Sequence, residues 1–198
     1  MLLERKDVNP DQPDTTYSRT PLWWAAKNGH EVMVQMLLQR KEVNPDKPDT
    51  TYRRTPLSWA AQNGDDGIVR MLLERKDVNA NQPDTKYGQT PLWWAAKNGH
   101  GGIVKMLLER GDLNPDQPDT MYGKTPLLWA AQNGHEGIVK MLLEQEDVNP
   151  NQPNIMYGQT PLWQATKNEH KGIIKMLLER KEVNPDQPDT LHGRTPLS

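Results

Sequence analysis

The sequence contains no cysteine and no phenylalanine, and its hydrophobic content is only 34%. Without cysteine there is no disulfide framework, no thiol nucleophile and no cysteine-based zinc site. No stretch approaches the roughly 18 consecutive apolar residues of a membrane-spanning helix, and residues 1–7 carry charges where a secretion signal needs an apolar run. A formal net charge of −2 gives no overall attraction to nucleic acid or acidic lipid. We therefore expect an intracellular, cytoplasmic protein that does not contact a membrane.

One tripeptide, Thr-Pro-Leu, occurs six times at a constant spacing of 35 residues. A fixed period of about 20–50 residues is typical of proteins that stack one small unit along an axis. The low hydrophobic content agrees with this, because each stacked unit buries only a thin strip against its neighbours. We predict one array over residues 1–198, with a partial unit at 1–15, full repeats at about 16–50, 51–85, 86–120, 121–155 and 156–190, and a partial unit at 191–198.

The third unit illustrates what each part is expected to form. Thr90 is a good N-cap and Pro91 suits the first helical position, which predicts a helix over about 91–98. Gly99 is then expected in the left-handed conformation that follows a helix. A second helix is predicted over about 102–109, where the apolar residues form one stripe. The remaining residues, rich in Asn, Pro, Asp and Gly, are predicted to form a hairpin-like loop.

After Thr-Pro-Leu, the units carry Ala-Ala, Asn-Gly-His, Ile-Val, Leu-Leu and Val-Asn in a constant order through residues 20–184. This order resembles the ankyrin repeat. The resemblance implies an all-α solenoid of stacked helix-turn-helix units with protruding hairpin-like loops. The long loops and the tryptophans are also similar to arrays in large fungal NOD-like-receptor-type proteins. Because the chain begins and ends inside a unit, we expect it to be a segment of a larger parent protein.

Tryptophan is distributed with a period of two units. One column alternates large and small residues, and the next is tryptophan until Gln164. We interpret both columns as core packing between units; the alternative is that the rings grip a ligand. Glu169 stands where the other units carry the left-handed glycine, a change expected to cost about 1 kcal/mol. The alternating column is Trp23, Ser58, Trp93, Leu128 and Trp163, and the constant column is Trp24, Trp59, Trp94 and Trp129.

The near-perfect periodicity argues against catalysis, because a catalytic site needs an asymmetric set of residues. We therefore predict that the protein is not an enzyme and needs no cofactor. The Asn- and Asp-rich loops offer oxygen ligands for calcium, but proline interrupts each loop and the glycine of known calcium loops is missing. The histidines recur with the repeat and do not gather at one metal, so we interpret each as bonding to the backbone at a helix start: His30, His100, His135 and His170.

The ankyrin resemblance implies that a partner docks on the concave face formed by the loops and first helices. With Arg194, the positions mapped to this face contain eight cations and no acid, which suggests a groove for an acidic partner. In the alternative interpretation, the loop acids Asp14, Asp49, Asp84 and Asp119 cancel this charge, and the tyrosines pack the loops. The candidate binding residues are Tyr17, Arg19, Lys27, Asn28, Tyr52, Arg54, Gln62, Asn63, Lys86, Tyr87, Gln89, Lys97, Asn98, Tyr122, Lys124, Gln132, Asn133, Tyr157, Gln159, Lys167 and Asn168.

The sequence thus predicts a non-catalytic module that binds another protein or peptide, with an acidic partner as the sharper hypothesis. One alternative is a sensor or spacer segment of a larger signalling receptor. Another is binding of nucleic acid or carbohydrate through the cations and aromatic rings, of which nucleic acid is not favoured by the net charge. Since no polar capping unit covers either end, self-association through the ends is a further expectation.

Overall fold

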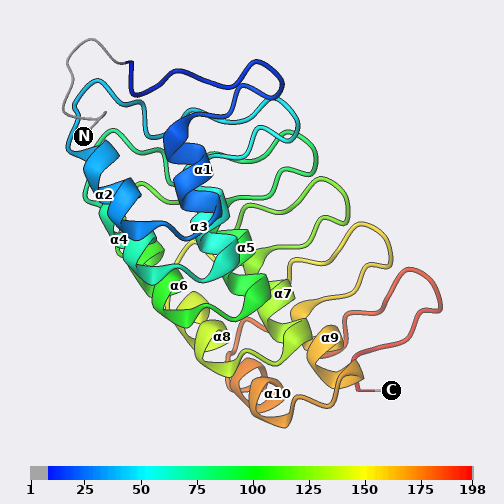
Figure 1. Ribbon diagram of the computed structural model, residues 1–198. Helices are drawn as coiled ribbons and strands as arrows, with labels where there is room; N and C mark the ends of the chain where they lie inside the picture. The colour runs from blue at the N-terminus through cyan, green and yellow to red at the C-terminus, as the bar shows by residue number, and fades with distance from the viewer. Residues whose placement is uncertain (1–8, 198) are drawn as a thin grey trace.

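A computed structural model of the protein describes residues 9–197. Within these residues the chain forms ten α-helices and no strand (Figure 1). The predicted all-α architecture is confirmed. Five helix pairs follow one another along the chain: α1 (Pro21–Lys27) with α2 (Glu31–Leu38), α3 (Pro56–Asn63) with α4 (Asp66–Leu73), α5 (Pro91–Asn98) with α6 (Gly101–Leu108), α7 (Pro126–Asn133) with α8 (Glu136–Leu143), and α9 (Pro161–Lys167) with α10 (Lys171–Leu178).

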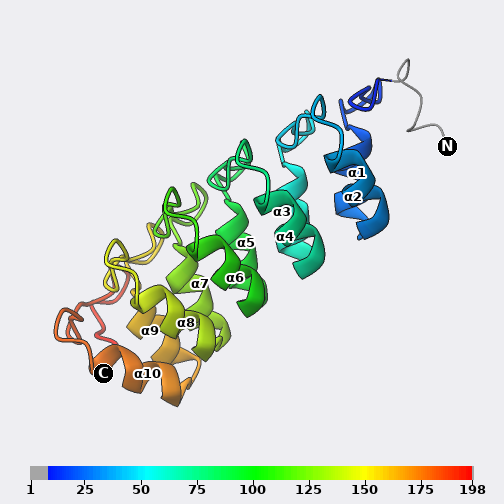
Figure 2. The ribbon, with the colours of Figure 1, turned by 90° about the vertical axis from the view of Figure 1, so that its left-hand side faces the viewer.

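The helices form two parallel rows. Each odd-numbered helix packs on the next odd-numbered helix, and each even-numbered helix packs on the next even-numbered one. The long loops connect one pair to the next and project from one side of the stack, as Figure 2 shows. We call the odd-numbered helices the inner row and the even-numbered helices the outer row. The arrangement is the predicted solenoid of helix-turn-helix units with protruding loops.

The helix ends follow from the repeated residues. At each inner helix the threonine hydroxyl accepts a hydrogen bond from the backbone N–H three residues later, as Thr90 does from Trp93. Proline then occupies the first helical position, where its missing N–H costs nothing. Gly99 ends α5 with φ of 84°, as predicted, and α6 begins and ends one residue before the predicted bounds. Glu169 also lies in the left-handed region, with φ of 59°.

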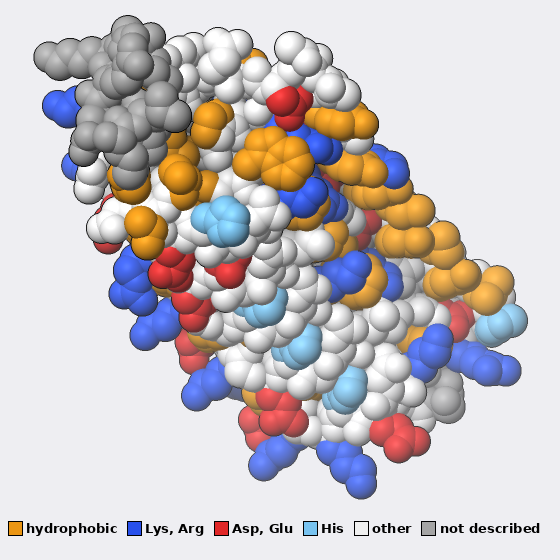
Figure 3. Space-filling view, viewed as in Figure 1, with side chains coloured by type: hydrophobic (Ala, Val, Ile, Leu, Met, Phe, Trp, Pro, Cys, Tyr) orange, Lys and Arg blue, Asp and Glu red, His pale blue; other side chains and the backbone are white. Residues whose placement is uncertain are grey.

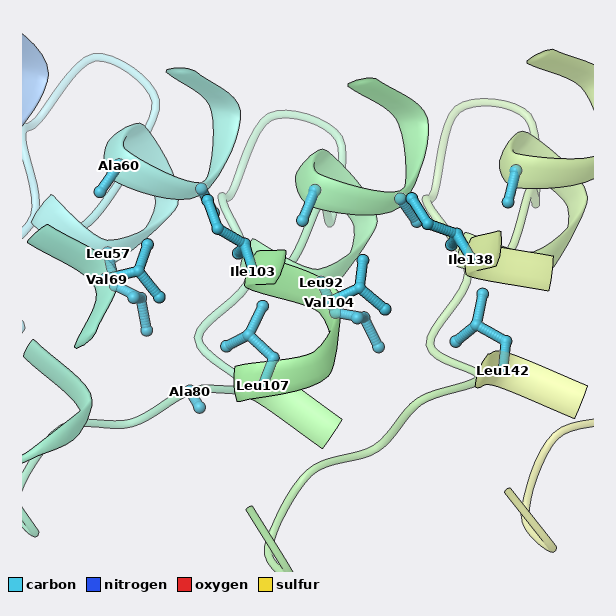
Figure 4. Packing of buried hydrophobic residues seen from close by; sticks show 14 of the residues in the cluster. Leu57, Ala60, Val69, Ala80, Leu92, Ile103, Val104, Leu107, Ile138 and Leu142 are labelled. Carbon is cyan, nitrogen blue, oxygen red and sulfur yellow. The ribbon is translucent and has the colours of Figure 1, made fainter. Parts of the chain in front are cut away.

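The core is a continuous strip between the two rows of helices. In Figure 4, Leu92 from the inner row and Val104 and Leu107 from the outer row lie together, and the same arrangement repeats at neighbouring pairs. All three side chains are fully buried. Small residues such as Ala60 and Ala95 let the inner helices approach one another closely. No single central core is needed, which explains how a chain with so few apolar residues folds.

Hydrogen bonds between successive loops hold the repeats in register. In each loop after the first described one, a backbone N–H donates to the carbonyl of the tyrosine one repeat earlier, as Thr85 does to Tyr52. A second hydrogen bond joins a loop side chain to the next repeat. For example, the carboxylate of Asp46 accepts from the backbone N–H of Asn79 at 2.7 Å. The loops are therefore parts of the stacked scaffold, each supported by its neighbour.

The side chains of His100, His135 and His170 bond to the backbone, but across repeats. Nε2 of His100 lies 3.1 Å from the carbonyl oxygen of Gln62, and Nε2 of His170 lies 3.0 Å from that of Gln132. None of the described histidines at the outer-helix starts caps its own helix with its side chain. The imidazole at the start of an outer helix therefore bonds to the end of the inner helix of the preceding repeat. The sequence interpretation specified a bond to the backbone but not the repeat to which it belongs.

Candidate functional site

Tryptophan rings and cations share one surface, where the inner helices meet the loops. In Figure 3, Lys and Arg side chains are interleaved with hydrophobic side chains along this side of the stack. We call this surface the aromatic–cationic band. Its cations are Lys27, Arg54, Lys97, Lys124 and Lys167, and the tryptophan rings beneath or beside them, some of them buried, are Trp23, Trp24, Trp59, Trp93, Trp94, Trp129 and Trp163.

The rings pack in clusters that repeat every two units. Trp23 is fully buried and meets Trp24 and Trp59 edge to face, with ring centroids 5.2 and 5.5 Å apart. Trp93 makes the corresponding contacts 70 residues later, and its indole N–H donates to the carbonyl oxygen of Lys124 at 3.1 Å. These two buried rings are core residues, as interpreted from the sequence. Trp24 differs, because 40% of its surface is exposed.

Each cation of the band lies over tryptophan rings. The Nζ atom of Lys97 lies 4.8 Å from the ring centroid of Trp93 and 4.5 Å from that of Trp129. Lys27 occupies the same position on the first cluster. Burial lowers the pKa of Lys97, and the negative face of each ring attracts the ammonium group. The rings thus hold the cations in place beside the loops.

The loop acids lie beneath this surface and are used by the loops themselves. Asp49, Asp84 and Asp119 are buried, and their Oδ1 atoms accept backbone N–H groups within the turn. Asp84 also forms an ion pair with Arg54 at 3.4 Å. Among the described residues, no ion pair joins Lys27, Lys97 or Lys124 to a carboxylate. Asp84 therefore neutralises Arg54 directly, whereas Lys97 and Lys124, without an ion pair in the described part of the chain, interact with the charge of Asp119 only at longer range.

The candidate asparagines have structural hydrogen bonds. The side-chain amides of Asn63, Asn98 and Asn133 donate to the backbone carbonyl of an inner helix one repeat earlier. Those of Asn28 and Asn168 donate to their own helix. The candidate glutamines fall into two groups. The side chains of Gln62 and Gln132 accept hydrogen bonds from Arg54 and Lys124 respectively. Gln89 and Gln159 are buried.

The tyrosines support the loops with their backbones and present their rings at the surface. Tyr17 and Tyr157 are exposed, and Tyr52, Tyr87 and Tyr122 are half-buried. The guanidinium of Arg19 lies 4.2 Å from the centroid of the Tyr17 ring. The ammonium of Lys86 lies 5.1 Å from the Tyr52 centroid and 4.8 Å from the Tyr87 centroid. The rings therefore extend the aromatic–cationic band towards the loop tips.

Sequence reasoning missed a hollow at the last two repeats. It has a volume of about 420 Å³ and lies between Tyr122, Lys124 and Gln132 on one side and Asn154, Met156, Gln164 and Lys167 on the other. Asn154, Met156 and Gln164 were not among the candidates. The available signal was their departure from the pattern two units earlier, where Asp84, Lys86 and Trp94 stand.

Within residues 9–197, histidine and carboxylate side chains nowhere come together in a group of three that could hold a metal ion. Each of the described helices is also too short to cross a bilayer.

Comparison with known proteins gives matches to family sequence models. The model described as ankyrin repeats in three copies matches residues 1–84 and 76–154. The model described as a single ankyrin repeat matches residues 157–190. No curated protein matches the chain. The predicted resemblance to the ankyrin repeat is confirmed across nearly all of the sequence.

Proposed function

Because the chain belongs to the ankyrin-repeat family, we propose that it is a protein–protein interaction module that binds an acidic segment of its partner along the aromatic–cationic band. Ankyrin repeats are generally modules for binding other proteins and are typically not catalytic. The choice of an acidic partner and of this face rests on the chemistry of the band.

The observation that carries the proposal is the row of lysines held over tryptophan rings. Lys27, Lys97 and Lys124 each lie within 5 Å of a ring centroid, and among the described residues none of them has a carboxylate ion-pair partner. A cation that is partly removed from water and unpaired attracts an anionic group more strongly than a fully solvated one. An acidic segment running along the band would meet these cations in turn.

The aromatic residues favour a protein partner. Trp, Tyr and Arg are enriched at protein interfaces, where they bury much surface and retain a polar group for hydrogen bonding. In this chain the rings are held by stacked helices and by hydrogen bonds between loops, so little side-chain entropy remains to be lost on binding. The stack therefore presents a pre-organised surface.

Charge reversal tests this proposal. The triple variant Lys27→Glu, Lys97→Glu and Lys167→Glu changes three lysines of the band. The control Lys105→Glu, Lys140→Glu and Lys175→Glu makes the same charge change at exposed positions of the outer row. The probe is a fluorescein-labelled peptide of ten glutamates, measured by fluorescence polarisation, with a melting curve for each variant.

We expect the band variant to bind at least about tenfold more weakly, a loss of 1.4 kcal/mol or more, and the control to bind much closer to the wild type. Equal losses in the two variants would mean that only net charge matters, and the proposed face would be wrong. A random single-stranded DNA 30-mer serves as a second probe. Tighter binding to it than to the peptide, with a steep dependence on salt, would support the nucleic-acid alternative.

A further inference from the structure

Two junctions between repeats occupy corresponding positions but differ in structure. The closed junction joins the second and third helix pairs and contains Arg54, Gln62, Asp84 and Trp94. The open junction joins the fourth and fifth pairs and contains, each 70 residues later, Lys124, Gln132, Asn154 and Gln164. The backbone hydrogen bonds are conserved between them, because Asp84 and Asn154 both donate from N–H to the carbonyl of the residue five positions later. The difference lies in the side chains.

The closed junction is filled and has its charge paired. Trp94 is only 8% exposed, and the guanidinium of Arg54 lies 4.1 Å from its ring centroid. Arg54 also donates to Asp84 at 3.4 Å and to Gln62 at 2.7 Å. Burial lowers the pKa of Arg54, and the nearby charge of Asp84 acts in the opposite direction. A cation, its counterion and an aromatic ring thus lie together at this junction, although the buried indole N–H of Trp94 has no hydrogen-bond partner among the described residues.

The open junction lacks the ring and the counterion. Gln164 is shorter than tryptophan and donates to Gln159 at 2.7 Å, and the hollow of about 420 Å³ occupies this region. Asn154 is 2% exposed, and its Oδ1 accepts the backbone N–H of Tyr157 at 2.8 Å. The Nδ2 of Asn154 is buried and has no hydrogen-bond partner. A buried donor without an acceptor costs about 1–3 kcal/mol and is uncommon in native proteins.

The charge of the open junction is also unbalanced. Lys124 and Lys167 line the hollow, and none of its lining residues is acidic. Burial lowers the pKa of Lys124, and the neighbouring charges of Lys97 and Lys167 lower it further, whereas Asp119 raises it. Lys124 donates to the neutral side chain of Gln132 at 2.6 Å. Arg54 has the corresponding glutamine as an acceptor and the carboxylate of Asp84 in addition. The hollow therefore combines two cations with an amide donor that lacks an acceptor.

We propose that this hollow binds the carboxylate of one aspartate or glutamate side chain of an acidic peptide, and so anchors the peptide on the band. The inference rests on the proposed function and assigns one position within it. A carboxylate has up to four lone-pair sites and accepts from ammonium and amide donors together. The bound carboxylate replaces the one that Asp84 supplies at the closed junction.

The rim of the hollow indicates what flanks that acidic residue. Met156 lines the hollow and is exposed, and Ile155 beside it is exposed as well. The corresponding residues two units earlier are Lys86 and Thr85, so the closed junction lacks this apolar rim. Exposed apolar side chains next to a pocket favour apolar neighbours in the ligand. An acidic residue followed by an apolar one fits both features.

The test variants give the open junction the aspartate and the tryptophan that the other repeats carry at these positions. Asn154→Asp places a carboxylate where Asp49, Asp84 and Asp119 stand, and Gln164→Trp restores the ring found at Trp24, Trp59, Trp94 and Trp129. Each change follows the chain's own pattern, so both variants are expected to fold, which melting curves check. The control Gln39→Glu adds the same charge as Asn154→Asp at an outer-helix end where the other repeats carry glutamate. The probe is the fluorescein-labelled ten-glutamate peptide.

We expect each restoring variant to bind the peptide at least about tenfold more weakly than the wild type, and Gln39→Glu to bind within about twofold of it. Unchanged binding in both restoring variants would overturn the anchor site, and the proposed function would stand if the band variant still lost affinity. Absence of binding to the wild type would overturn both the anchor site and the acidic-partner proposal.

Discussion

The closed and open junctions show how one scaffold gives two different surfaces. Both have the same threonine caps, the same loop turns and the same hydrogen bonds between loops. At the closed junction Arg54 pairs with Asp84 and rests on the ring of Trp94, whose buried indole N–H has no partner within residues 9–197. At the open junction three substitutions remove the ring, the negative charge and the guanidinium, and leave a hollow with cations at its edge. In a repeat protein, departures from the pattern therefore identify where a surface can do something that its neighbours do not.

The largest effect is expected from opening the closed junction. Trp94→Gln removes a buried ring and the surface on which Arg54 rests, and we expect the free energy of unfolding to fall by about 3 kcal/mol. Urea unfolding followed by circular dichroism measures this. A loss below about 1 kcal/mol would show that the ring contributes little to closing the junction.

The counterion is expected to matter less than the ring. Asp84→Asn keeps the acceptor for the loop N–H but removes the charge that faces Arg54, and we expect a loss of about 2 kcal/mol. The reverse change, Asn154→Asp, gives Lys124 a counterion and should leave stability equal or slightly higher. A loss of stability for Asp84→Asn and no loss for Asn154→Asp are the expected result. Equal losses would mean that the two junctions do not differ in their electrostatics.

Each junction has a half-buried loop aspartate at the same position of the repeat, Asp46 at the closed junction and Asp116 at the open one. We expect these carboxylates to make the stability of the protein depend on pH. Burial raises the pKa of Asp116 to about 6 and raises that of Asp46 as well. In each carboxylate Oδ2 accepts a backbone N–H and Oδ1 has no partner. An acid with a raised pKa contributes stability below its unfolded pKa of 3.8, and this contribution is lost as pH rises through about 6.

Asparagine at these positions should remove that pH dependence. Asn81 and Asn151 occupy the same loop position in the alternate repeats, and each amide donates to a carbonyl of the next repeat. Discounting for solvent screening, we expect Asp116→Asn to add about 1 kcal/mol at pH 8 and less at pH 4. Urea unfolding at the two pH values measures the difference. A gain that is equal at both would show that ionisation of Asp116 is not its cause.

The smallest effect concerns the last helix pair, which forms one side of the open junction. Glu169 has φ of 59°, where the preceding pairs have glycine. Glu169→Gly should relieve this strain and stabilise the protein by about 0.5–1 kcal/mol. Binding of the ten-glutamate peptide should not change. Loss of binding would indicate that the hollow depends on strain in this helix pair.

Most of the fold could be predicted from the sequence, because each element has a local cause. Thr90 and Pro91 set the start of α5, Gly99 sets its end, and the 35-residue period makes the same argument hold in every unit. The role of the histidines was only partly predictable. His100 bonds to the backbone as expected, but the carbonyl belongs to Gln62 of the preceding repeat, and local spacing does not show how two repeats are offset.

The candidate site was predictable as a face but not as a pocket. The lysines and tyrosines of the band repeat, so their common surface follows from the period. The hollow depends on what is missing at Gln164 and Asn154, and the volume left by a smaller side chain depends on how its neighbours repack. Gln89 and Gln159, chosen by position alone, are buried. Their burial depends on how adjacent loops contact each other.

The central claim is that an acidic segment binds the band and enters the open junction. The most direct measurement is a titration of the ¹⁵N-labelled protein with the ten-glutamate peptide, followed by NMR at the side-chain amides of Asn154, Gln132 and Gln164. The account predicts the largest shifts at Asn154, with smaller shifts at the other two. Shifts confined to residues of the outer helices, with the Asn154 amide unmoved at saturating peptide, would contradict it.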